Sequence, residues 1–229
     1  MSRYERVYLY LCALFLASLL VCNMFVFKLF DIPLPFVGLT PLIAGIIPYP
    51  ITFLCTDLIS ELYGKKRADH VVYAGFMVSV FMLIMIQVAK ALPVSHVQAD
   101  PELVQAHLLA VFGQSARAIL ASMVAYLVAQ LCDVRLFHFW KDLTKGKHLW
   151  LRNNASTLVS QIVDTVLVVA ILFGGTLPFN NLVKLMVSSY VFKMIIALVD
   201  TPFFYLGAHL FKDISAETER RIEAGEAGP

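Results

Sequence analysis

The sequence predicts an all-α integral membrane protein with six transmembrane helices and with both termini in the cytoplasm. Of its residues, 59% are hydrophobic and only 15% are charged, whereas soluble domains average about 25% charged residues. Apolar runs recur along the chain at about the 20 residues that a helix needs to cross a bilayer. The positive charges concentrate in alternate connections between these runs, which gives the orientation. A net charge of +2 gives no reason to expect a nucleic-acid partner.

The first predicted span, residues 7–27, follows a short basic N-terminus. A signal peptide would have a shorter apolar core and a cleavage site between small residues, so we expect this span to be retained. Five further apolar runs follow it along the chain. The six predicted spans cover residues 7–27, 36–60, 71–92, 117–136, 155–173 and 182–211.

The second span, residues 36–60, is interrupted by Pro41, Gly45, Pro48 and Pro50. Proline does not continue a helix, because it lacks the amide hydrogen and its ring clashes with the preceding turn. In transporters, broken helices tend to line substrate cavities. We therefore expect a broken second helix beside a cavity, with a merely kinked helix as the alternative.

The connection between the third and fourth spans contains a short helix of its own. Pro101 and Glu102 form a helix start and Gly113 its end, which is typical of a short helix lying at the membrane surface. At the other end of the chain, residues 212–229 are charged and end in small residues. We expect residues 1–211 to form one six-span domain and the tail to be disordered in the cytoplasm.

The orientation follows from the distribution of Lys and Arg. Thirteen of the 18 lie in the N-terminus, in the second and fourth connections or in the tail, and four lie in the remaining connections. The last one, Lys193, falls within the sixth span. The positive-inside rule then places both termini in the cytoplasm.

The fifth span carries an unusual run of polar side chains. Residues three or four apart share one face of a helix, so amides, hydroxyls and a carboxylate gather on one face and Leu, Val and Ile on the other. An Asp near the middle of a span costs about 2.5 to 3.5 kcal/mol on insertion scales. It is therefore expected to pair, to face water or to bind a ligand. The residues on this face are Asn153 or Asn154, Thr157, Gln161, Asp164 and Thr165.

Several ionisable residues fall within the predicted spans. Lys193 and Asp164 both lie near mid-depth and can form a buried ion pair, and Asp200 lies two turns from Lys193 on the same face. The alternative for Asp164, Gln161 and Lys193 is a structural polar lock between helices. For the carboxylates nearest the cytoplasm, the alternative is solvation or pairing with a nearby Lys or Arg. The ionisable residues are Asp57, Glu61 and Asp133 near the cytoplasm, and Asp164, Lys193 and Asp200 deeper in the membrane.

Catalytic motifs do not occur in the sequence. It contains no H-E-x-x-H metal motif, no G-x-S-x-G nucleophile motif and no Walker glycine loop. The four cysteines lie in apolar runs without C-x-x-C spacing, which is typical of small core residues rather than of a metal site. We therefore expect a protein that is not an enzyme and that uses no cofactor and no metal.

Three segments together carry a family resemblance. They are Ile51-Thr52-Phe53-Leu54-Cys55-Thr56-Asp57-Leu58-Ile59-Ser60-Glu61-Leu62-Tyr63-Gly64, then Leu149-Trp150-Leu151-Arg152-Asn153-Asn154-Ala155-Ser156-Thr157 with Ser160-Gln161-x-x-Asp164-Thr165, and Phe192-Lys193 with Asp200-Thr201-Pro202. Jointly they resemble the queuosine precursor transporter family of bacteria, also described as a vitamin-uptake-like group. The resemblance covers about residues 7–211. It implies a six-helix, multi-pass transporter of the inner membrane, without its own ATPase domain, that takes up 7-cyano-7-deazaguanine or its aminomethyl analogue for tRNA modification.

The polar residues of the spans suit such a cargo. A 7-deazaguanine base presents a ring N–H and an amine side by side, which a carboxylate can accept together, and its carbonyl oxygen needs a donor. Asp164 or Asp57 is the expected carboxylate, and Phe53, Tyr63 or Tyr205 could stack on the ring. The expected substrate-binding residues are Asp164, Gln161, Lys193, Asp57, Asn154, Glu61 and Asp200.

Other functions stay open on the sequence alone. The chain could be the substrate-binding membrane subunit of an ATP-driven uptake system for a vitamin or nucleobase, or a structural membrane protein that binds no ligand. A carrier for another small polar metabolite is a further alternative. The expected partners are the small-molecule substrate and the lipid bilayer, with no nucleic acid, and the sequence leaves open whether the chain forms a homo-oligomer.

Overall fold

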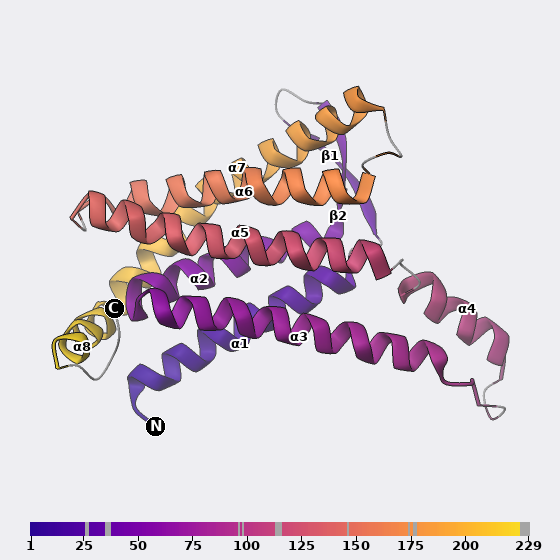
Figure 1. Cartoon of the computed structure of the whole chain (residues 1–229), viewed down its shortest axis with the longest axis horizontal. Coiled ribbons are helices and arrows are strands. Elements are labelled where there is room, and N and C mark those ends of the chain that lie inside the picture. The colour runs from indigo at the N-terminus through magenta and orange to yellow at the C-terminus, as the bar shows by residue number, and fades with distance from the viewer. Residues whose placement is uncertain are drawn as a thin grey trace.

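The computed structural model is an elongated bundle whose long helices run back and forth along one axis (Figure 1). It describes residues 1–25, 28–34, 38–95, 97, 99–112, 116–145, 147–173, 175 and 178–224. The long helices are α1 (Arg3–Met24), α3 (Lys65–Ala91), α5 (Ala116–Leu143), α6 (Leu149–Phe173) and α7 (Phe179–Leu210). The shorter helices are α2 (Tyr49–Tyr63), α4 (Pro101–Phe112) and α8 (Lys212–Glu223). Between α1 and α2 lie strands β1 (Leu29–Leu34) and β2 (Gly38–Ile43) and the 3-10 turn η1 (Ala44–Ile46).

Four of the described helices, α1, α3, α6 and α7, are long and apolar enough to cross a membrane. Their outward faces expose large apolar side chains, such as Met77 at 68% and Phe81 at 62% exposure on α3. Soluble monomers rarely expose contiguous apolar surface, so these faces suit a lipid environment. The predicted all-α membrane class is thereby confirmed. Helix α2 has only 15 residues, about 22 Å at 1.5 Å per residue.

The predicted second span, residues 36–60, is not one helix broken by prolines. Pro33 and Pro41 lie in the antiparallel β1–β2 hairpin, where each strand has an unpaired edge that tolerates a missing amide hydrogen. Helix α2 starts only after Pro48, and Pro50 occupies its first turn, where a helix needs no amide donor. The prolines therefore replace the first half of the predicted helix with a hairpin and set the position at which α2 begins.

The other helices extend beyond the predicted spans at their charged ends. Helix α3 begins at Lys65 rather than at residue 71, α5 ends at Leu143 rather than 136, and α6 begins at Leu149 rather than 155. An apolar run predicts only the part of a helix that lipid surrounds, whereas backbone hydrogen bonding continues into polar surroundings. The short helix predicted to start at Pro101 is confirmed as α4, and Gly113 lies outside the described residues.

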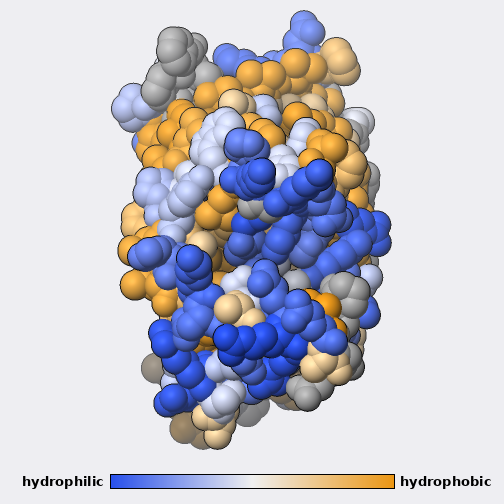
Figure 2. All heavy atoms as spheres, turned by 90° about the vertical axis from the view of Figure 1, so that its left-hand side faces the viewer, coloured by the Kyte–Doolittle hydropathy of each residue, from blue (hydrophilic) through white to orange (hydrophobic). Residues whose placement is uncertain are grey.

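Both termini lie at one end of the bundle, which we call the terminal end (Figure 1). The turn between α2 and α3 and the connection between α5 and α6 lie there too, so the segments that concentrate Lys and Arg are gathered together. Figure 2 shows this end covered largely by hydrophilic residues, with apolar residues along the sides. The Lys- and Arg-rich segments, which are far apart in the sequence, therefore lie together at the terminal end.

The tail that was expected to be disordered forms helix α8 at the terminal end. Ile214 is 2% exposed and packs in the core. The Thr218 hydroxyl donates to the carbonyl oxygen of Leu62 at 2.6 Å. Since Ile214 and Thr218 are one turn apart, they give α8 an inward face that its charged composition conceals. The expectation of disorder is wrong for α8, and residues 225–229 lie outside the described part of the chain.

Helix α2 is largely enclosed by other helices. Ten of its 15 residues are buried, because α1, α3, α5, α7 and α8 all pack against it. Helix α6 in turn lies between α5 and α7. Many side chains buried on α2, α5 and α6 are polar, and polar groups persist inside a membrane protein where they pair or bind a ligand. They include Asp57 and Ser60 on α2, Gln130 and Asp133 on α5, and Thr157, Ser160, Gln161 and Asp164 on α6.

Candidate functional site

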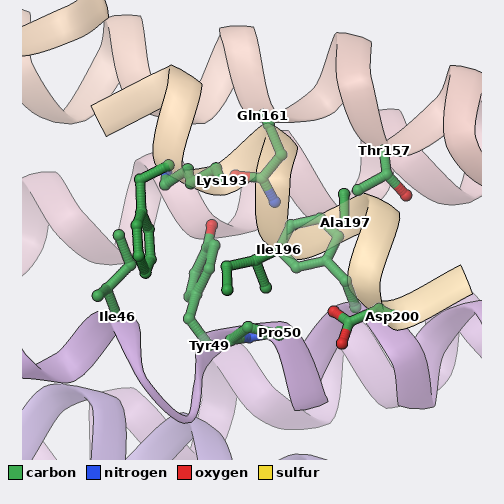
Figure 3. Close-up of a pocket in the computed structure, with 11 residues that line it drawn as sticks. Ile46, Tyr49, Pro50, Thr157, Gln161, Lys193, Ile196, Ala197 and Asp200 are labelled. Carbon is green, nitrogen blue, oxygen red and sulfur yellow. The ribbon is translucent and has the colours of Figure 1, made fainter. Parts of the chain in front are cut away.

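A pocket lies between the start of α2 and the facing sides of α6 and α7 (Figure 3). Its interior holds about 20 Å³ of free space, room for about one water molecule, so a larger ligand fits only if the lining helices move apart. Aromatic and aliphatic side chains form most of its lining, with a few polar groups among them. This composition is typical of sites for small organic molecules.

On the side formed by η1 and the start of α2, two of the four lining residues are aromatic. Ile46, Tyr49, Pro50 and Phe53 line it. Because α2 starts after Pro48, Tyr49 and Phe53 are one helical turn apart and share a face, with ring centroids 5.2 Å apart. Two rings are therefore available to stack on a planar ligand.

The α6 side of the pocket carries Thr157 and Gln161, one turn apart. Gln161 is 4% exposed, and its Oε1 atom has no hydrogen-bond partner within the described residues. Figure 3 shows its amide group directed into the pocket. A buried polar group without a partner costs about 1 to 3 kcal/mol, so a donor on a ligand would stabilise this site.

The α7 side carries both charged residues of the pocket, Lys193 and Asp200. The ammonium group of Lys193 forms the predicted ion pair with Asp164 and donates to the Thr165 hydroxyl at 3.3 Å. It also lies 4.9 Å from the centroid of the Tyr49 ring, within cation–π range. Asp164 does not line the pocket itself. It holds Lys193 in position beside the pocket.

Asp200 lies two turns beyond Lys193 on α7, about 10 Å along the helix axis. Both line the pocket, as the spacing predicted, and Figure 3 shows them toward opposite ends of it. Among the described residues, Asp200 forms no ion pair. Its carboxylate therefore offers two acceptor oxygens to a ligand.

Asp57 and Asn154 lie next to the pocket without lining it. Thr157 lines the pocket, and its hydroxyl lies 3.4 Å from Asp57. Asn154 donates to the carbonyl oxygen of Trp150 and accepts from the Thr201 hydroxyl, each at 3.1 Å. Asp57 is only 3% exposed, so the alternative that it is solvated near the cytoplasm is wrong.

Glu61 lies away from the pocket, near the terminal end of α2. It forms ion pairs with Lys141, at 3.3 Å, and with Arg152. These pairs join α2 to α5 and α6, in place of the pairing with neighbouring lysines that the sequence left open. Glu61 is one of the seven expected substrate-binding residues, and the structure does not bring it to the pocket.

Of the three aromatic residues expected to stack on a ligand, the structure brings Phe53 to the pocket. Tyr63 is buried in another cluster near the terminal end, and Tyr205 does not line the pocket. Sequence reasoning missed Tyr49 and Phe192, which do line it. Tyr49 could have been found from its one-turn spacing to Phe53, and Phe192 from its place beside the intramembrane lysine.

Known proteins match most of the chain. A family model described as "Putative vitamin uptake transporter" matches residues 43–207. The "Probable queuosine precursor transporter" of Bacillus subtilis (strain 168) is 29% identical over 169 residues, which cover 73% of this chain and 72% of that protein. The "Queuosine precursor transporter" of Escherichia coli (strain K12) is 26% identical over 158 residues, covering 68% and 67%. No solved structure matches the chain.

The matched residues include all of α2 and α6 and most of α7, the helices that surround the pocket. The relatives are named transporters rather than enzymes. Together with the apolar helices, they identify a transporter that passes several times through the bacterial inner membrane. The chain belongs to the vitamin uptake transporter family.

Proposed function

We propose that this transporter imports a queuosine precursor base, 7-cyano-7-deazaguanine or 7-aminomethyl-7-deazaguanine, through the pocket between α2, α6 and α7. The names of the Bacillus subtilis and Escherichia coli relatives support this cargo class. The observation that carries it is the pocket itself, which combines aromatic rings with an amide, an ammonium group and a carboxylate that has no cationic partner among the described residues.

Each polar group of the pocket matches an edge of the base. The carboxylate of Asp200 accepts the ring N–H and the exocyclic amine together, and Lys193 donates to the carbonyl oxygen. Gln161 pairs with a remaining donor or acceptor through its amide. Tyr49 and Phe53 stack on the ring. Asp200 therefore takes the role that the sequence suggested for Asp164 or Asp57, because Asp164 is occupied by its ion pair with Lys193.

We also propose a topology of six spans within residues 1–211, with both termini in the cytoplasm. The four long apolar helices would be joined in the membrane by α5 and by α2, the latter extended toward the far side by the β1–β2 hairpin. The gathering of both termini and the cationic connections at the terminal end supports this orientation. Helix α8 would then lie on the cytoplasmic surface.

The test is thermal stabilisation of the purified protein in detergent by 7-cyano-7-deazaguanine, with guanine, queuine and riboflavin as comparators. A ligand at 100 times its dissociation constant adds about 2.7 kcal/mol to the stability of a protein that binds it only when folded. We expect stabilisation by the deazaguanine, and its loss in Gln161→Ala. Gln87→Ala, at an exposed position on α3, is the matched control. No stabilisation by either precursor in a folded protein would show that the cargo is a different molecule.

A further inference from the structure

Two carboxyl groups are buried side by side next to the pocket. Asp57 on α2 and Asp133 on α5 are 3% and 0% exposed, and hydroxyl groups one turn apart on α6 contact the two carboxyl groups, Thr157 that of Asp57 and Ser160 that of Asp133. Neither lines the pocket. The roles proposed above for the base therefore leave both of them unused.

Hydroxyl groups of α6 hold this pair of carboxyl groups from one side. The Thr157 hydroxyl lies 3.4 Å from Oδ2 of Asp57 and 2.9 Å from the carbonyl oxygen of Asn153, and Ser160, one turn on, donates to Oδ1 of Asp133 at 2.8 Å. The other oxygen of each carboxyl group has no hydrogen-bond partner among the described residues. The side-chain amide nitrogen of Gln130, one turn from Asp133 and fully buried, also lacks one. These oxygen and nitrogen atoms can each take part in a further hydrogen bond.

The charges around the pair do not compensate two carboxylates. Asp200 faces it from α7, while Tyr49 and Cys55 on α2 and Cys132 and Arg135 on α5 are the other titratable groups near it. Arg135 is exposed. The buried cations of the neighbouring helices pair elsewhere: Lys193 with Asp164, and Arg152 with Glu61.

Two adjacent carboxyl groups that are buried without a cation do not both ionise, because each negative charge opposes the other and neither is solvated. One bound proton removes this conflict. It neutralises one carboxyl group and supplies the donor that the unpartnered oxygen of the other group lacks.

Thr157 connects the pair to the pocket. Its side chain lines the pocket and its hydroxyl lies 3.4 Å from Oδ2 of Asp57. A base in the pocket would therefore contact a side chain whose hydroxyl lies beside the carboxyl pair. A rearrangement of α2 against α5 would separate Asp57 from Asp133 and release the proton.

We propose that Asp57 and Asp133 together bind one proton, and that this proton crosses the membrane with each imported base. The identity of the base rests on the proposed function. The proton enters the pair from the outer side and leaves to the cytoplasm, so import is driven by the proton gradient. One O–H bond of the carboxyl pair forms as water on the outer side delivers the proton, and the same bond breaks as the proton passes to water on the cytoplasmic side.

The test uses the full chain reconstituted in proteoliposomes with labelled 7-cyano-7-deazaguanine and with the membrane potential clamped to zero. One proton per base predicts about tenfold accumulation for each pH unit of gradient, acid outside. A protonophore should abolish this accumulation. Asp133→Asn should fill the vesicles only to equilibrium, because an amide releases no proton. Asp142→Asn, at an exposed position on the same helix, should accumulate the base like the wild type.

A second readout does not depend on the cargo. Infrared spectroscopy of the wild-type protein should show the C=O stretch of a buried protonated carboxyl group, and this band should shift or lose intensity in Asp133→Asn and stay unchanged in Asp142→Asn. If Asp133→Asn does not fold, Asp57→Asn takes its place for the infrared measurement. Proton coupling is then tested by whether accumulation in the wild type follows the pH gradient.

Three results would overturn the proton site: accumulation that ignores the pH gradient, accumulation driven by a sodium gradient instead, or a wild-type protein without the carboxylic acid band. A different pattern would overturn only the cargo. If the band is present but the base is neither bound nor taken up, the carboxyl pair holds its proton and the imported molecule has been wrongly identified.

Discussion

At the scale of single residues, the ion pair of Lys193 and Asp164 is the contact on which the pocket depends. The two side chains are 12% and 7% exposed, so removing one leaves the other as a buried unpaired charge. Such a loss costs about 3 to 5 kcal/mol. We predict that Lys193→Met lowers the melting temperature in detergent and abolishes binding of the base. Adding Asp164→Asn should restore much of the stability but no binding.

An exposed ion pair provides the control for this prediction. Arg221 and Glu217 on α8 pair at 2.9 Å with side chains that are 34% and 39% exposed. Solvent screens such a pair, so Glu217→Gln should change the free energy of unfolding by less than about 1 kcal/mol. If Lys193→Met melted at the wild-type temperature, the buried pair would not be a stabilising contact.

Spacing along the chain predicts some of these contacts, whereas long-range packing determines others. The pairing of Lys193 with Asp164 could be predicted from sequence, since both are charged groups at similar depth in apolar helices. The partners of Glu61 could not, because Lys141 and Arg152 come from helices 80 and 91 residues away in sequence. The same holds for Asp133, whose position near Asp57 depends on the way that α2 packs against α5.

At the scale of elements, the close approach of α3 to α1 and α5 depends on Gly75. A Cβ atom at this position would lie 2.5 Å from the hydroxyl of Tyr126 and 2.8 Å from the ring of Phe15. Both rings are buried and have little room to move. We predict that Gly75→Ala destabilises the protein by about 1 to 3 kcal/mol, as overpacking of a core does, measured by thermal melting in detergent.

The control for Gly75→Ala is a series of substitutions of increasing size at the same position. Gly75→Ser and Gly75→Val should destabilise progressively more as the added volume grows. A flat series would show that α3 can shift away from Phe15 and Tyr126 without cost.

Helix α8 depends on Thr218 in a comparable way. Its hydroxyl donates to the Leu62 carbonyl at 2.6 Å and lies 3.2 Å from the Tyr4 hydroxyl. Thr218→Val keeps the shape and removes these bonds, so we expect a loss of about 1 to 3 kcal/mol and faster proteolysis of the tail. Ser215→Ala, on the same helix but not buried, should leave proteolysis unchanged. Equal proteolysis of both variants would contradict the docking of α8.

Two elements, the β1–β2 hairpin and α8, differ from what prolines and charges in the sequence predicted. In the predicted second span, the prolines indicated an interruption, but only strand pairing shows that Pro33 and Pro41 belong to a hairpin. In the tail, the charges indicated disorder, and the two inward residues Ile214 and Thr218 outweigh them once α1 and α2 supply a surface. Both errors arise because the deciding contacts come from elements distant in sequence.

At the scale of the whole molecule, the proposed orientation makes a prediction about accessibility. Both termini and the cationic connections lie at the terminal end, and the positive-inside rule assigns this end to the cytoplasm. A fluorescent protein fused to the C-terminus should therefore mature and fluoresce, whereas a periplasmic phosphatase fused there should stay inactive. An active phosphatase at this position would reverse the orientation of the bundle.

The central claim, that the pocket binds a queuosine precursor base, is tested most directly by equilibrium binding of labelled 7-cyano-7-deazaguanine to the purified full chain. We predict saturable binding of one base per chain. Asp200→Asn should weaken it about tenfold or more, since hydrogen bonds to a charged group contribute about 1.5 to 3 kcal/mol each. Asp142→Asn should bind like the wild type. Absence of saturable binding, or equal affinity in Asp200→Asn, would contradict the assignment of this pocket.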